Sequence, residues 1–142
     1  LLGGEESGGI AVSSHIPERD GIWMGLILWE YMANTGKSLS RLIQEVYQIT
    51  GSFAMDRYDL HVPESQKQAI INQCKEKSYI QFGDYPVTGH EDIDGYKFLL
   101  NEDNWVMIRP SGTEPVLRVY AQANNINEVI QILDATKETI LA

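Results

Sequence analysis

Cysteine, histidine and positive charge are all scarce in this sequence, and each shortage excludes a class of protein. Cys74 is the single cysteine, so the chain has no internal disulfide, which is typical of proteins in a reducing cytoplasm. The three histidines, at positions 15, 61 and 90, show no metal-ligand spacing. Only 11 Lys and Arg oppose 20 Asp and Glu, and the resulting net charge of −9 disfavours nucleic acid and anionic membranes as partners.

Long apolar runs are missing as well. The longest, from Ile22 to Trp29, is too short to cross a bilayer, and no signal peptide is visible, so we expect a cytoplasmic protein. Hydrophobic residues make up 43% of the sequence, which is typical of a globular protein able to build a core. A length of 142 residues suits one domain with a piece of another. The chain opens on two leucines rather than methionine, which favours a fragment boundary. Cys74 falls among apolar residues of an expected helix, which predicts a buried hydrophobe rather than a reactive thiol.

Residues 109–115, which read RPSGTEP, form a compact candidate site for a phosphate group. The guanidinium of Arg109 matches two phosphate oxygens, and Ser111 and Thr113 supply hydroxyl donors. The amides of Ser111, Gly112 and Thr113 are expected to point inward as an anion-binding nest, between two stiffening prolines. Arg118 adds a second cation on the next expected strand. The segment lacks P-loop spacing, and on composition alone an ordinary hairpin turn explains it equally well.

A second polar cluster lies at the other end of the chain. Residues 3–9, which read GGEESGG, place Glu5, Glu6 and Ser7 between glycine pairs. Carboxylates accept hydrogen bonds from the vicinal hydroxyls of sugars, and glycine lets a ligand approach the backbone. Taken alone, such a segment is more often a solvated turn. The run His15-Ile16-Pro17-Glu18-Arg19-Asp20-Gly21 follows and is also rich in hydrogen-bonding groups.

Together these segments resemble the α-D-phosphohexomutase superfamily, the phosphoglucomutases and phosphomannomutases. The resemblance implies that Glu5 and Ser7 bind the sugar, and that Arg19, with His15 less well matched, contacts the ligand after the sugar loop. It assigns the substrate phosphate to Arg109, Ser111, Gly112 and Thr113. Members of the superfamily have four domains, and their catalytic phosphoserine and Mg²⁺ loop lie upstream of the sugar loop. The resemblance therefore places no catalytic residue and no metal ligand in this chain.

The resemblance also implies an activity for the whole protein. It is the reversible transfer of a phosphoryl group between the 1 and 6 positions of a hexose, with Mg²⁺ and a hexose 1,6-bisphosphate activator. The expected partners are a hexose phosphate and the N-terminal domains of the same enzyme, and the fragment alone is expected to be inactive. Glu6 favours glucose or mannose, because the glucosamine-specific branch tends to carry glutamine there. Two alternatives stay open: a non-catalytic sugar-phosphate-binding or regulatory module, and a purely structural interaction domain.

The periodicity of the sequence predicts an α+β fold, an antiparallel sheet with helices on one face. The expected helices cover Ile22–Met32 (buried, with Trp23 and Trp29 in packing roles and Gly36 as cap), Ser38–Gly51, Pro63–Lys77 and a last one capped by Asn127. The expected strands are Phe53–Val62, Val87–Asp94, Tyr96–Leu100, Trp105–Arg109 and Val116–Ala123. In the last strand, alternation puts Arg118 on the face opposite Leu117 and Val119. The resemblance adds a TATA-box-binding-protein-like fourth domain at 53–142, a connecting helix or hinge at 37–52, and the tail of a third, α/β domain at 1–36.

Overall fold

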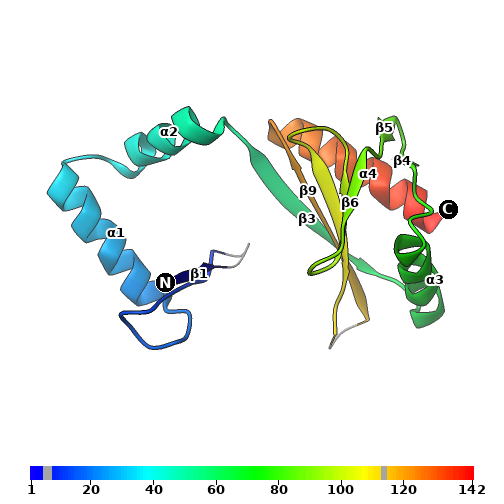
Figure 1. Cartoon of the computed structure of the whole chain (residues 1–142), viewed down its shortest axis with the longest axis horizontal. Helices are drawn as coiled ribbons and strands as arrows, with labels where there is room; N and C mark the ends of the chain where they lie inside the picture. Colours follow the sequence, from blue (N-terminus) through cyan, green and yellow to red (C-terminus); the bar gives the residue numbers. More distant parts are fainter. Residues whose placement is uncertain (5–7, 113–114) are drawn as a thin grey trace. The chain divides into compact units, whose positions relative to one another are not determined.

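The computed structural model describes residues 1–4, 8–112 and 115–142, and it divides into two compact units (Figure 1). Unit 1 runs from Leu1 to Gly51 and unit 2 from Ser52 to Ala142. Glu5, Ser7 and Thr113, three of the predicted ligand-binding residues, lie outside the described residues.

Unit 1 consists of a short hairpin followed by two helices. Strands β1 (Leu2–Gly4) and β2 (Ile10–Val12) pair antiparallel on either side of the sugar-loop segment. Helix α1 (Gly21–Thr35) begins where the Asp20 carboxylate accepts two backbone N–H groups, and it ends at Gly36 in the left-handed conformation. Helix α2 (Leu39–Thr50) begins at Ser38, as its capping side chain predicts. No helix in the described residues is long and apolar enough to span a membrane.

The predicted burial of α1 is wrong within this chain. Among the described residues of unit 1 neither helix contains a buried side chain, and Ile22 and Trp29 are 81% and 72% exposed. The apolar pattern identified the helix correctly, but burial needs a second layer of structure, and the described part of unit 1 adds only a short hairpin and α2. Trp23 instead stacks on the imidazole of His15, with ring centroids 4.7 Å apart.

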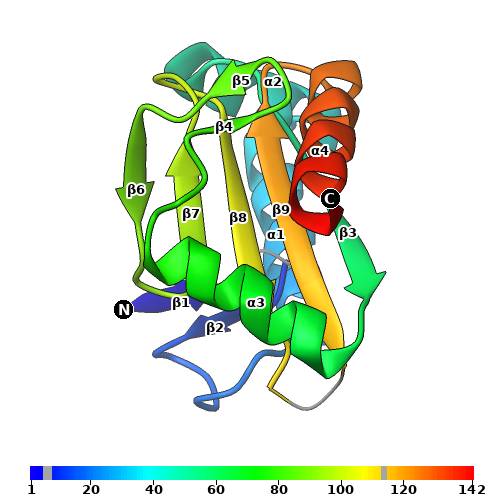
Figure 2. The same cartoon turned by 90° about the vertical axis from the view of Figure 1, so that its right-hand side faces the viewer.

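Unit 2 is an α+β domain with a five-stranded antiparallel sheet in the order β3-β9-β8-β7-β6. Helices α3 (Glu64–Lys75) and α4 (Ile126–Leu141) cover one face of this sheet, as Figure 2 shows. The strands are β3 (Ala54–His61), β6 (Gly89–Glu91), β7 (Tyr96–Leu99), β8 (Trp105–Pro110) and β9 (Val116–Ala123). A small extra hairpin, β4 (Gln81–Phe82) and β5 (Tyr85–Pro86), was not predicted.

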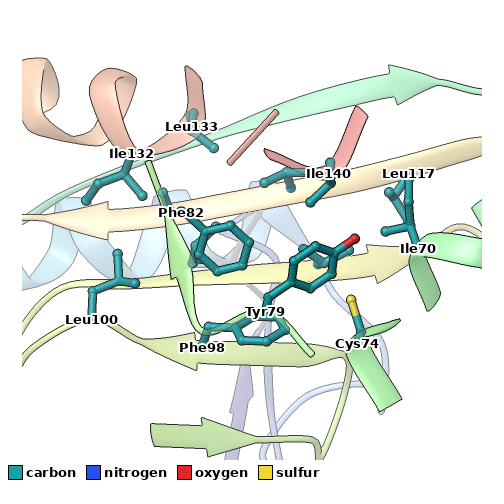
Figure 3. Close-up of a cluster of buried hydrophobic side chains, with 14 of the residues drawn as sticks. Ile70, Cys74, Tyr79, Phe82, Phe98, Leu100, Leu117, Ile132, Leu133 and Ile140 are labelled. Carbon is teal, nitrogen blue, oxygen red and sulfur yellow. The ribbon is translucent and has the colours of Figure 1, made fainter. Parts of the chain in front are cut away.

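The core of unit 2 lies between the sheet and its two helices. Figure 3 shows Phe82 and Phe98 near the centre, with Ile132 and Leu133 of α4 above them. Cys74 of α3 is buried in the same cluster, which confirms its predicted packing role. In β9 the alternation also holds, because Leu117 and Val119 are fully buried while Arg118 is partly exposed.

The predicted cap of α4 is wrong by two residues. The helix begins after Asn125, whose extended backbone lets its Oδ1 accept the N–H of Glu128 at 3.1 Å. Asn127 already lies in the first turn. The correct signal was the pairing of Asn125 with a glutamate three residues later, a capping-box spacing. Here the Glu128 carboxylate accepts instead from Asn104 Nδ2 at 2.7 Å, which ties α4 to the turn before β8.

Candidate functional site

Two arginines meet at one end of the sheet of unit 2. Arg109 on β8 and Arg118 on β9 are direct cross-strand partners, and the segment that joins the two strands is the predicted phosphate loop. Directly opposed residues of antiparallel strands project from the same face. Because Val106, Ile108, Leu117 and Val119 are buried beneath the helices, both guanidinium groups belong to the other face.

Each of these arginines lies beside an aspartate. The Nη1 of Arg109 is 3.5 Å from Oδ2 of Asp94, and the Nε of Arg118 is 4.0 Å from Oδ1 of Asp59. The same Asp59 oxygen is 3.4 Å from Nε of Arg57. These distances are long for charge-assisted hydrogen bonds, which are about 2.7–2.9 Å. The carboxylates of Asp94 and Asp59 therefore offset part of the repulsion between the two cations.

A groove of about 320 Å³ adjoins Arg109 and is lined in part by Asp92, Asp94 and Tyr96. Gly95 supports this wall with a φ of 143°, a conformation that favours glycine. A Cβ added there would lie 3.3 Å from the Ile108 carbonyl and 3.4 Å from Cβ of Arg109. The close approach of Gly95 to β8 therefore helps to fix the backbone from which Arg109 projects.

The first residue of the phosphate loop differs from the prediction. The N–H of Ser111 donates to the Val116 carbonyl at 2.9 Å, so this amide continues the β8–β9 ladder and does not join a nest. The first N–H after β8, that of Ser111, extends the pairing of β8 with β9. The expectation of three inward-facing amides is therefore wrong at Ser111. Gly112 remains the described loop residue with open space around it, since a Cβ there would meet nothing within 4 Å.

Lys67 is a residue of this region that sequence reasoning missed. Its side chain is largely buried, and its Nζ donates to the backbone carbonyl of Ser111 at 3.2 Å. The signal was present in the sequence: Lys67 shares a helical face with Ile70, Ile71 and Cys74. A lysine on the apolar face of a helix indicates a specific buried partner, because an unpaired charge there is costly.

In unit 1 the structure places the two basic candidates in different surroundings. The His15 Nε2 lies 2.9 Å from Oδ2 of Asp20, the cap of α1. The pKa of that carboxyl is lowered, first by the backbone N–H of Trp23 and then by His15. Arg19 instead lies over the backbone of Gly9, where an added Cβ would come 2.7 Å from its Cδ. Arg19 is thus next to the end of the sugar-loop segment, while His15 is oriented toward α1.

Comparison with known proteins identifies the family. Residues 1–50 match the family model described as "Phosphoglucomutase/phosphomannomutase, alpha/beta/alpha domain III". Residues 60–138 match the model described as "Phosphoglucomutase/phosphomannomutase, C-terminal domain". The chain belongs to the phosphoglucomutase/phosphomannomutase family. The C-terminal-domain match contains Lys67, Arg109 and Arg118, and the two matches together confirm the resemblance carried by the two loops.

Individual members of the family agree with this assignment. The chain is 29% identical over 133 residues to a phosphoglucomutase/phosphomannomutase of Thermococcus kodakarensis, and covers 94% of itself and 27% of that protein. It is 39% identical over 126 residues to a phosphoglucosamine mutase of Methanococcus aeolicus, covering 88% of itself and 26% of the relative. The chain thus spans about a quarter of the length of these curated relatives.

A solved structure supports the fold. A phosphoglucomutase/phosphomannomutase family protein from Burkholderia thailandensis superimposes with a TM-score of 0.66 at 20% identity, covering 98% of this chain and 27% of that one. The likeness confirms the predicted α+β class. Along the sequence, the boundary between the two units falls between residues 51 and 52, next to the end of the domain III match at residue 50.

Proposed function

We propose that this chain carries the substrate-binding part of a hexose-phosphate mutase. In this proposal unit 2 holds the phosphate group that is not being transferred, and unit 1 binds the sugar ring. The observation that carries the proposal is the cross-strand pair of Arg109 and Arg118 beside the loop within the C-terminal-domain match. Opposed like charges destabilise a sheet, and an anion bound between them would offset that cost.

The charges suit a phosphomonoester. Such a group carries about −1.5 to −2 charges at neutral pH, which two guanidinium groups neutralise better than one. In the proposed complex Arg109 leaves Asp94 and makes a forked contact with two phosphate oxygens. Ser111 supplies a hydroxyl, Gly112 its backbone N–H, and Thr113 a further hydroxyl. Arg118 adds the second cation.

The sugar is bound by unit 1 in the same proposal. Glu5 and Ser7 contact the 3- and 4-hydroxyls, whose arrangement is preserved when the sugar turns around between the two transfers. Arg19 lies against Gly9, so its guanidinium is well placed to serve the same ligand. His15 is held by Asp20 and Trp23, which gives its ring a defined orientation beside the first turn of α1.

The complete enzyme would interconvert hexose 1-phosphate and hexose 6-phosphate. A phosphoserine in the upstream part gives its phosphoryl group to the free hydroxyl, and the resulting bisphosphate turns around and returns its other phosphoryl group to the serine. Binding energy at the idle phosphate positions the reacting end for transfer. In this proposal the Mg²⁺ is bound by the upstream part of the enzyme, as the resemblance to the superfamily implies.

The same proposal covers the organisation of the chain and its sugar preference. Residues 1–36 and 53–142 would be domain segments joined by a hinge at 37–52. The exposed apolar side chains of α1 would be covered by the remainder of the third domain. Glu6 favours glucose or mannose. Relatives of the chain are named for glucose, mannose and glucosamine phosphates, so all three sugars belong in the assay.

The test is a mutase assay of the full-length enzyme with glucose, mannose and glucosamine phosphates. We expect Arg109→Ala to lower kcat/KM by about 2–4 kcal/mol of transition-state stabilisation, through lost charged hydrogen bonds in a closed site. Lys137→Ala is the matched control, because it removes the same charge from the exposed side of α4. An unchanged kcat/KM in Arg109→Ala would mean that the loop is an ordinary hairpin turn and does not bind phosphate. Tight binding of glucose 1-phosphate by the 142-residue chain alone would favour a binding module instead.

A further inference from the structure

We infer that Lys67 is a positioning residue for the phosphate loop, which acts by fixing the orientation of the Ser111–Gly112 peptide. The inference rests on the proposed function, because it concerns how that loop presents a donor to phosphate. It starts from one contact: the Lys67 Nζ donates to the Ser111 carbonyl at 3.2 Å, across 44 positions of sequence.

The geometry of the peptide bond links this contact to the ligand side of the loop. In a planar trans peptide the carbonyl of one residue and the N–H of the next point in opposite directions. Lys67 holds the Ser111 carbonyl toward α3, so the N–H of Gly112 is directed away from that helix. A ligand on the arginine-bearing face of the sheet is therefore on the side to which this N–H points.

Ser111 is held at both of its backbone polar groups. Its N–H donates to the Val116 carbonyl at 2.9 Å, and its carbonyl accepts from Lys67. Without the second contact the peptide would rotate easily, because the following residue is glycine, and glycine has a wide choice of backbone angles. Lys67 thus replaces conformational freedom with one orientation, and a preorganised donor binds an anion more tightly than a mobile one.

The position of Lys67 is difficult to explain by stability alone. The residue is only 7% exposed and shares its helical face with Ile70, Ile71 and Cys74. Its Nζ also lies 3.7 Å from Oε2 of the exposed Glu64. Burying an ammonium costs several kcal/mol, and an apolar side chain of similar length would fill the same space at lower cost. A role in the loop accounts for a cation at this position.

The experiment follows the Gly112 amide of the 142-residue chain by ¹⁵N–¹H NMR while inorganic phosphate is added at constant ionic strength. The variant is Lys67→Met, which keeps the apolar stem and removes the donor. Lys67→Arg restores a donor and a charge. Lys75→Met is the matched control, because it makes the same substitution at an exposed position of the same helix.

We expect phosphate to shift the Gly112 amide in the wild type and in Lys75→Met with equal affinity. Lys67→Met should bind phosphate about tenfold more weakly, the equivalent of about 1.4 kcal/mol, and Lys67→Arg should recover part of the loss. Unshifted core amides, such as those of Val106 and Leu133, would show that each variant is folded. If Lys67→Met does not fold, the positioning role is tested by comparing Lys67→Arg with the wild type. The longer, forked head group of arginine should alter the chemical shift of the Gly112 amide.

Two results would overturn the inference, and they differ. Equal phosphate affinity in wild type and Lys67→Met would refute the positioning role and leave the proposed function intact. No shift of Gly112 in the wild type would remove the phosphate site itself, and with it the basis of both.

Discussion

Arg109 and Arg118 face each other directly across β8 and β9, so one register position of the sheet carries two guanidinium groups. A like-charged pair at such a position destabilises a sheet by up to about 1 kcal/mol. Asp94 and Asp59, at 3.5 and 4.0 Å from the two cations, offset the repulsion only loosely. In the proposed complex phosphate replaces Asp94 as the partner of Arg109, and this exchange is open to test.

Asp94→Asn should tighten the binding of inorganic phosphate to the 142-residue chain roughly two- to fivefold. The physical reason is that phosphate no longer competes with a carboxylate for Arg109. Asp94 is 75% exposed, so its removal leaves little buried charge uncompensated. NMR titration measures the affinity. Asp92→Asn, in the same groove, is the control for a general loss of negative charge, and an identical gain in both variants would contradict the specific pairing.

Asn125→Ala should lower the free energy of unfolding of unit 2 by about 1 kcal/mol, because it removes the side chain that caps α4. Asn127→Ala changes an exposed residue inside the first turn and should alter the same quantity by less than about 0.5 kcal/mol. Urea denaturation monitored by circular dichroism compares the two. A larger loss of unfolding free energy in Asn127→Ala would indicate that Asn127 caps α4, as the sequence predicted.

Gly9→Ala should raise the KM of the full-length enzyme for its sugar phosphate several-fold with little loss of stability. The new Cβ would collide with the Arg19 side chain, whose flexible end moves at low cost but loses its position beside the sugar-loop segment. Gly3→Ala is the control, because a Cβ there meets nothing within 4 Å. Steady-state kinetics on both variants measures the effect. An unaltered KM in Gly9→Ala would mean that Arg19 does not bind the ligand.

Unit 2 should lose stability as the pH rises above about 9. Burial raises the pKa of the Cys74 thiol to about 12, and burial followed by the neighbouring Cys74 raises the pKa of Tyr79 to about 12. Both groups keep their protons in the folded state, whereas the unfolded chain releases them from its ordinary values of 9.0 and 10.0 upward. The unfolded state then binds fewer protons, so the free energy of unfolding falls by up to about 1.4 kcal/mol per pH unit and group.

Urea unfolding at pH 7.5, 9 and 10 measures this decline, with Cys74→Ala as the comparison. The substitution should lower stability at all three pH values through the lost packing, yet reduce the slope above pH 9. The native thiol should also resist alkylation at pH 8, because almost none of it is ionised. Rapid native-state labelling would contradict the burial on which the prediction depends.

Local signals in the sequence predicted most of the elements. Asp20, Ser38, Gly36 and Gly51 mark helix ends through side-chain caps and permitted backbone angles, which act over a few residues. The alternation in β9 placed Arg118 off the core side for the same reason. The error at α4 arose where three nearby asparagines, at positions 124, 125 and 127, offered the same kind of cap, and the prediction did not use the glutamate three residues after Asn125 to distinguish them.

Two motifs of a few residues, together with periodicity, were sufficient to determine the family of this protein and the class of its fold, and they predicted a phosphate-binding role for Arg109 and Arg118. Only the tertiary structure decided which groups those residues meet: that Arg109 is opposed to Arg118, that the Ser111 amide closes a hairpin, and that Lys67 reaches the loop from α3. The physical reason is the distance along the chain over which each interaction acts. Helix caps and strand alternation act between near neighbours, whereas strand register and the contact of a helix with a distant loop follow from how the whole core packs.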